Sequence, residues 1–142
     1  ASQVRAVGTQ TLRVAGNAAD FLRRAEKVLG YPIEVIAGRE EARLVFEGCA
    51  HTLPLSTARR LVVDIGGRST ELIVGQGHQP RWMQSYPVGS VSWSMQHFPN
   101  GRWSRTALRT AEVAAQAVLD EALALHDLEV FNPAAQAVAW PE

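Results

Sequence analysis

The chain has 142 residues, of which 46% are hydrophobic and 20% charged, a composition that indicates a packed core and excludes a disordered chain. Fourteen Lys and Arg balance fourteen Asp and Glu, which argues against a dedicated nucleic-acid or membrane-surface binder, because such proteins usually have a basic excess. The single cysteine, Cys49, excludes an intramolecular disulfide framework and a Cys-rich zinc site. No apolar run approaches the roughly 20 residues that span a bilayer, and no secretory pattern opens the chain, so we expect a cytoplasmic protein.

The first third of the chain predicts two strands and two helices. Residues 3–7 are typical of a short strand, and residues 18–29 predict an amphipathic helix with Asn17 as its N-cap. The short β-branched run 33–37 predicts a buried strand, and a second helix follows over residues 39–50. The inner stripe of this second helix is expected to consist of Ala42, Val45, Phe46 and Cys49.

The remainder of the chain predicts a meander followed by helices. A Pro/Ser/Thr-rich linker over residues 52–57 marks the expected boundary between two lobes. Strands at 61–65, 70–74 and 81–88, separated by short turns, predict an antiparallel meander. The later elements are a short helix at 91–98, a turn at 99–101, a long helix from the cap Ser104 to about residue 126 with Leu108 and Ala111 facing inward, and a last strand at 137–140. Strands mixed with amphipathic helices predict an α/β class.

The strongest signal for chemistry is the stretch 64–71, DIGGRSTE. Glycines let a backbone turn tightly and bring consecutive N–H groups close to an anion, and hydroxyls can complete a phosphate cradle. The residues expected to bind phosphate are Gly66, Gly67, Arg68, Ser69 and Thr70. Asp64 and Glu71 lie on the two arms of this hairpin, and paired carboxylates beside a phosphate suggest Mg²⁺ held largely through waters. From this stretch alone, a glycine-rich hairpin with exposed acids is an equally good interpretation.

Two weaker signals precede this hairpin. Glu40 and Glu41 fall in the first turn of a predicted helix, where acids commonly just complement the helix dipole, although one of them could orient and deprotonate a water. Arg13 follows the first strand and could clamp phosphate oxygens, although a solvated loop arginine is the simpler interpretation.

Together and in this order, the segments GTQTLR, GREEARLVFEG and LVVDIGGRSTELIVG resemble the exopolyphosphatase and guanosine-pentaphosphate phosphohydrolase family. The resemblance is nearly continuous from about residue 4 to residue 89 and looser beyond it. It implies an actin-like, ribonuclease-H-like α/β phosphatase fold of two lobes, present here incompletely. Residues 1–55 would be the end of the first lobe and residues 56–142 the start of the second.

The family's roles carry over residue by residue. By resemblance, Glu41 is the general base, Arg13 a phosphate clamp, and Asp64 and Glu71 the acids that hold Mg²⁺, with residues 66–70 as the phosphate loop. The implied reaction is hydrolysis of the terminal phosphate of inorganic polyphosphate, which needs positioning and charge neutralisation and no covalent nucleophile. Guanosine pentaphosphate is the alternative substrate, and the alternatives of another class are a nucleotide-binding or a non-catalytic actin-like module. A homodimer is possible. We expect all four histidines (His51, His78, His97 and His126) to be structural or solvated, and Cys49 to fill a helix face.

The chain departs from the family pattern in two respects. Arg68 replaces the third glycine of the family's DIGGGSTE motif, which would cost roughly 1 kcal/mol if the position needs a positive φ; we expect the loop to tolerate it. The family's first phosphate loop is also missing, so we expect a fragment that is nearly inactive by itself.

Overall fold

The computed structural model of the chain describes residues 4–125, with side chains described as far as residue 120. The elements are β1 (Ala6–Gly8), α1 (Gln10–Val14), α2 (Ala18–Leu29), β2 (Ile33–Val35), α3 (Gly38–Thr52), β3 (Arg59–Ile65), β4 (Thr70–Gln76), β5 (Gln79–Tyr86), α4 (Ser90–His97), the 3₁₀ turn η1 (Pro99–Gly101) and α5 (Arg105–Leu125). The predicted α/β class is therefore confirmed. The strand predicted at 137–140 lies outside the described residues.

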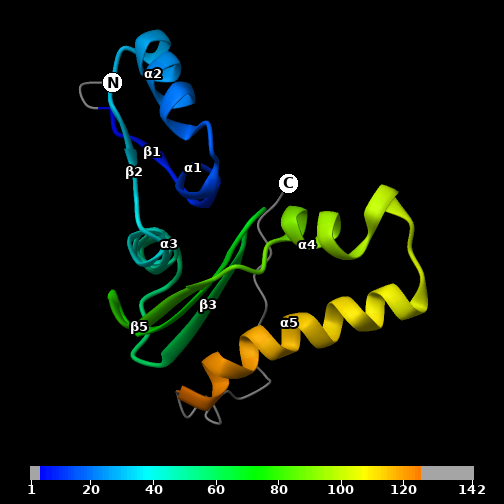
Figure 1. Cartoon of the computed structure of the whole chain (residues 1–142). Coiled ribbons are helices and arrows are strands. Elements are labelled where there is room, and N and C mark those ends of the chain that lie inside the picture. The colour runs from blue at the N-terminus through cyan, green and yellow to red at the C-terminus, as the bar shows by residue number, and fades with distance from the viewer. Residues whose placement is uncertain (1–3, 126–142) are drawn as a thin grey trace.

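The first part of the chain is a small parallel unit. Strands β1 and β2 pair in parallel, and α1 and α2 form the connection between them, as parallel pairing requires (Figure 1). The expectation of a buried strand at 33–37 was wrong: Val35 is 37% exposed, and only Ile36, after the strand, is buried. The reason is that β2 has β1 as its sole partner among the described strands. The short helix α1 occupies residues that the sequence had suggested as a loop.

The second part is the predicted antiparallel meander, with strand order β3-β4-β5. Helix α3 packs across one face of this sheet, and Figure 1 shows it end-on between the sheet and the parallel unit. The core lies at this contact and consists of Ala42, Phe46, Ala50 and Ile73, with Val45, Val62 and Met83 packed around them. The predicted stripe is thus confirmed at Ala42 and Phe46, whereas Cys49 is half-buried and Ala50 takes the inner place.

Helices α4 and α5 form an arm beside the sheet (Figure 1). Ser104 caps α5 as predicted, because its Oγ accepts a hydrogen bond from the Ala107 N–H at 3.0 Å. The indole N–H of Trp93 donates to the Ala111 carbonyl at 3.1 Å and joins the two helices. Ala111 is buried as expected, but Leu108 is 53% exposed, because the described residues cover only part of the apolar stripe of α5.

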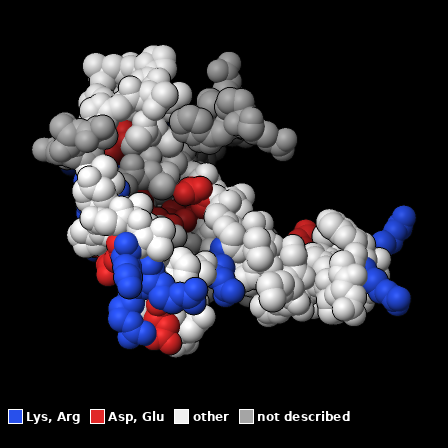
Figure 2. Space-filling view, turned by 90° about the horizontal axis from the view of Figure 1, so that it is seen from above, with Lys and Arg blue, Asp and Glu red and all other residues white. Residues whose placement is uncertain are grey.

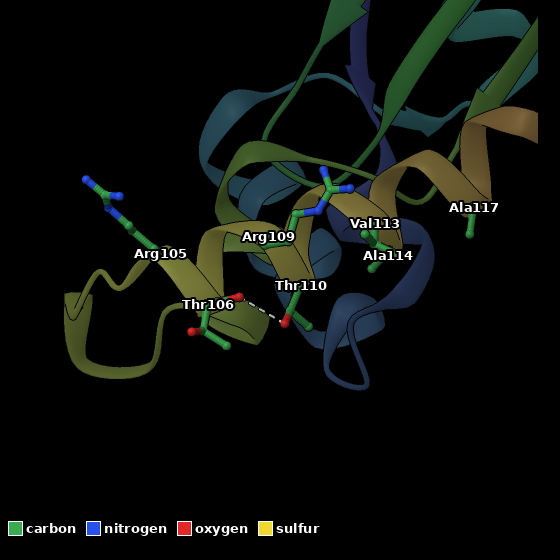
Figure 3. A pocket seen from close by; sticks show the side chains of 7 residues that line it. All are labelled: Arg105, Thr106, Arg109, Thr110, Val113, Ala114 and Ala117. Atoms are coloured by element: carbon green, nitrogen blue, oxygen red, sulfur yellow. Dashed lines mark hydrogen bonds between the residues drawn. The ribbon is translucent and has the colours of Figure 1, made fainter.

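A shallow groove of about 690 Å³ follows the outer side of α5. Figure 3 shows its lining on one helix face: Arg105, Thr106, Arg109, Thr110, Val113, Ala114 and Ala117. Thr110 Oγ1 donates to the Thr106 carbonyl at 3.0 Å within this face. None of the described helices combines the length and apolar character that crossing a membrane needs.

The predicted lobe boundary falls between α3 and β3. Helix α3 precedes it and nevertheless packs on the sheet that follows it. The division into lobes at residues 55 and 56 stays a prediction.

Candidate active site

Arg13 and Glu41 meet in an ion pair between α1 and the first turn of α3. Arg13 Nη1 donates to Glu41 Oε2 at 3.0 Å and to the Ile36 carbonyl at 2.7 Å. Arg13 Nε donates to Gln10 Oε1 at 3.0 Å, so two of the three guanidinium nitrogens hold the side chain in place. The two side chains are only 20% and 16% exposed, which makes the pair more rigid than a surface ion pair.

The third guanidinium nitrogen, Nη2 of Arg13, is buried and has no hydrogen-bond partner among the described residues. A buried donor without a partner destabilises a protein by roughly 1–3 kcal/mol. Gly38 explains how it is accommodated: a Cβ there would lie 3.5 Å from Nη2 and 2.7 Å from Ser85 Cβ. The missing side chain at residue 38 therefore lets α3, Arg13 and β5 approach one another.

Glutamates 40 and 41 are adjacent in sequence but have different surroundings. Glu40 accepts hydrogen bonds from Arg43 Nε at 2.8 Å and from Arg43 Nη2 at 2.7 Å, and the hydrogen bond from Arg43 lowers the pKa of Glu40. Glu41 instead contacts Arg13, and no described residue donates to its Oε1. Only Glu41 therefore has a carboxylate oxygen available beside the unpartnered arginine nitrogen.

Glu71 is the most deeply buried acid of the described residues, at 1% exposure. Its Oε1 accepts a hydrogen bond from Ser85 Oγ at 2.7 Å. Burial raises the pKa of Glu71; hydrogen bonds from Ser85 and Ser69 oppose this rise, and the negative charges of Glu41 and Asp64 add to it. The negative charge of Glu41 thus acts on the pKa of Glu71, at the end of the 64–71 hairpin.

Asp64 and Glu71 are register partners on β3 and β4. Side chains of directly paired residues lie on the same face of a sheet, and like charges so placed repel each other. A cation between them would relieve this repulsion, so the pair suits the hard, oxygen-binding Mg²⁺. Within the described residues, no three His, Cys, Asp or Glu side chains converge to hold a metal ion by themselves. The two acids therefore fit a metal that takes its other ligands from water and substrate phosphate.

The start of α4 holds the loop 66–69 through three backbone hydrogen bonds. The backbone N–H of Ser90 donates to the Gly66 carbonyl at 2.9 Å, and those of Val91 and Ser92 donate to the Gly67 carbonyl at 2.9 and 3.0 Å. Among the described residues, no backbone acceptor binds the N–H groups of residues 67 and 68. Thr70 Oγ1 donates its hydroxyl proton to the Val88 carbonyl, so this proton is not available to a phosphate oxygen.

The conformation at Arg68 explains why a side chain is tolerated there. The described part of the chain has one non-glycine residue with positive φ, Asn100, so Arg68 does not incur the left-handed strain considered above. The position that cannot accept a side chain is Gly89, where a Cβ would lie 2.3 Å from the N, Cα and C atoms of Arg68. The glycine that this loop most requires therefore belongs to a different segment.

The structure joins Arg13 to Glu41 and pairs Asp64 with Glu71. Further residues contact these groups and the loop between them. Figure 2 shows acidic side chains near the middle of the face seen from above, with Lys and Arg side chains at the lower left and at the far right end. Sequence reasoning missed Ser85, Gly38 and Gly89, because each acts through a contact with a distant segment. A local signal existed only for Gly38, which directly precedes the Arg-Glu-Glu run.

Residues 1–139 match the Ppx/GppA phosphatase family. The chain belongs to this family. Its members are phosphoanhydride hydrolases. Over 123 residues it is 46% identical to the guanosine-5'-triphosphate,3'-diphosphate pyrophosphatase of Vibrio cholerae, an alignment that covers 87% of this chain and 24% of the relative. The chain thus spans about a quarter of the length of the curated relatives it matches.

Solved structures of the Ppx/GppA family share its fold. An exopolyphosphatase-like protein is 34% identical with a TM-score of 0.79, covering 84% of this chain and 39% of its own. An exopolyphosphatase from Cytophaga hutchinsonii is 27% identical with a TM-score of 0.78, covering 87% of this chain and 40% of its own. The PPX-GPPA enzyme of Aquifex aeolicus is 31% identical with a TM-score of 0.67, covering 84% and 40%. The actin-like fold is therefore confirmed for the part of it that this chain spans.

Proposed function

We propose that the chain supplies the water-activating acid and one phosphate-binding loop of an exopolyphosphatase, which releases the terminal phosphate of inorganic polyphosphate. The observation that supports this most is the Arg13–Glu41 pair, in which one arginine nitrogen and one carboxylate oxygen remain free beside the 64–71 hairpin. Buried donors in proteins normally have a partner, so the unpaired Nη2 of Arg13 suits a phosphate oxygen as its acceptor.

Glu41 is proposed as the general base. The carboxylate would accept a proton from a water whose oxygen forms the new bond to the terminal phosphorus, while the bond from phosphorus to the bridging oxygen breaks and the shortened chain leaves with that oxygen. Arg13 Nη1 fixes Oε2 of Glu41, so Oε1 is the oxygen that would orient the water. Positioned base catalysis of this kind contributes roughly 10²–10⁴-fold to a rate.

The phosphate would be bound by groups that already lack partners. Arg13 Nη2 supplies a charged donor, and the N–H groups of residues 67 and 68 supply neutral ones. Donors held in place before the reaction stabilise charge that grows on phosphoryl oxygens without further reorganisation. Ser85 acts indirectly as a positioning residue, because its hydroxyl fixes the Glu71 carboxylate.

Asp64 and Glu71 are proposed to hold Mg²⁺, with water and substrate completing its shell. When bound, this ion would neutralise charge on the phosphoryl oxygens. The protein's own contribution is to hold two like charges side by side, one of them buried, where a cation lowers the free energy of both.

A second substrate is guanosine pentaphosphate, and the name of the Vibrio cholerae relative favours it. Both substrates present a terminal phosphoanhydride to the same groups. Phosphate release from polyphosphate and from the guanosine compound, measured side by side on the full-length gene product, separates the two. A greater kcat/KM for the guanosine substrate would reverse our choice.

The test of hydrolysis itself is Glu41→Gln with Glu40→Gln as the matched control. We expect Glu41→Gln to lower phosphate release by about 10²–10⁴-fold. Glu40→Gln removes the same charge one residue away, where Arg43 is the partner, and should change the rate by less than about threefold. Equal effects of the two substitutions would contradict the proposal and favour a nucleotide-binding or non-catalytic actin-like module.

A further inference from the structure

Two histidines meet at the end of α3 that lies farthest from Glu41. His51 is in the last turn of α3, His78 is in the β4–β5 turn, and their ring centroids are 4.6 Å apart with planes inclined by 31°. We propose that His51 and His78 form a surface site for a divalent late transition metal of the Ni²⁺ or Cu²⁺ type. This site is separate from the proposed Mg²⁺ site, because Asp64 and Glu71 pair near the opposite end of β4 from the turn that holds His78.

The ring separation suits chelation of one ion. With metal–nitrogen bonds of about 2.0–2.1 Å, two imidazoles at neighbouring positions of a square or octahedral shell place their centroids roughly 4.5 Å apart. A tetrahedral shell needs a wider separation, roughly 5.2 Å by the same construction. The observed 4.6 Å is compatible with both imidazoles binding one ion in the tetragonal geometry of Ni²⁺ and Cu²⁺.

The approach of the two rings is fixed by the core beneath them. A Cβ at Gly75 would lie 2.1 Å from Phe46 Cζ, so the Phe46 ring rests directly on the β4 backbone. His51 follows Phe46 by five residues, and His78 follows Gly75 by three. Gly77, with a φ of +57°, makes the tight turn that brings His78 back toward α3. The backbones that carry the two histidines are thus held together before any metal binds, which reduces the entropy lost on binding.

Both imidazoles are available to a ligand. His51 and His78 are exposed, and neither forms a hydrogen bond with another described residue. No third His, Cys, Asp or Glu of the described residues completes the cluster, so waters would fill the other positions. Imidazole nitrogen suits late transition metals, whereas Mg²⁺ selects oxygen ligands, and this difference separates the two sites experimentally.

The experiment is a Ni²⁺ titration of the protein without a histidine tag, at about pH 7.5, where imidazoles are mostly neutral. At about tenfold excess over the dissociation constant, we expect the Tm to rise by roughly 4 °C. His51→Gln and His78→Gln should each abolish the rise, and His97→Gln, which alters a histidine packed on Trp93, should retain it. Each variant is compared with its own metal-free Tm.

A measurement without substitution completes the test. Substoichiometric Cu²⁺ should broaden the imidazole NMR signals of His51 and His78 together, ahead of the signal of His97. A Tm rise that persists in either single variant, no rise at all, or broadening of only one of the two histidines would overturn the proposal.

Discussion

Gly89→Ala tests whether the support of the phosphate loop matters for catalysis. A Cβ at residue 89 would lie 2.3 Å from three backbone atoms of Arg68, whereas carbon atoms in contact are roughly 3.5 Å apart. The loop must therefore move by about 1.2 Å, and displacements of about 1 Å in a catalytic site lower rates by roughly 10²-fold. Overpacking of this kind also lowers the free energy of unfolding by about 1–3 kcal/mol.

The assay is phosphate release from polyphosphate by the full-length gene product, together with urea unfolding followed by circular dichroism. Gly48→Ala is the matched control, because no atom lies within 4 Å of the Cβ that it adds in the middle of α3. We expect this control to retain activity and to gain about 0.5–1 kcal/mol in helix stability. A Gly89→Ala protein with unchanged rate and unchanged stability would refute the reasoning about loop support.

Three further outcomes follow from the same contacts. Arg68→Gly should keep hydrolysis within about threefold of the original, because φ at residue 68 is not in the left-handed region; a loss of more than about tenfold in phosphate release would contradict this. Burial raises the pKa of Glu71 in the folded state, so the free energy of unfolding should fall as the pH rises above about 4.3, the ordinary glutamate value, and through the folded pKa. Glu71→Gln should remove this fall and should be more stable than the original protein at pH 7. Urea titrations of both proteins across that pH range measure the difference. Ser85→Ala removes the hydrogen bond to Glu71 Oε1 and should raise the Mg²⁺ concentration needed for half-maximal phosphate release by about 10–100-fold. Ser85→Thr keeps a hydroxyl and should restore much of this Mg²⁺ affinity. An unchanged Mg²⁺ dependence in Ser85→Ala would exclude a positioning role.

Local sequence patterns predicted the elements of this site well. The strand-like runs and short turns of residues 61–88 predicted the meander, and the meander places Asp64 opposite Glu71. The apolar spacing of residues 39–50 predicted α3, which turns Ala42 and Phe46 to the sheet and Glu41 toward Arg13. Each of these features follows from residues that are near one another in sequence, where periodicity is informative.

Contacts between distant segments could not be predicted in the same way. Ser85 reaches Glu71 from the neighbouring strand β5, where it is the register partner of Glu71, and Gly89 meets Arg68 from the start of another helix. The sequence suggested that His51 and His78 are structural or solvated, because their spacing matches no metal motif, and the packing of Phe46 on Gly75 brings them together. Nothing in the local pattern of either histidine indicates this.

Helix α3 has the proposed base near one end, the core contact in its middle and a histidine near the other end. Ten residues separate Glu41 from His51, which corresponds to about 15 Å along the helix axis. A paramagnetic ion on the histidines would thus sit at a fixed, known distance from the place where hydrolysis is proposed to occur. The enhancement of ³¹P relaxation would then measure the distance from this ion to a bound phosphate, without any chemical label.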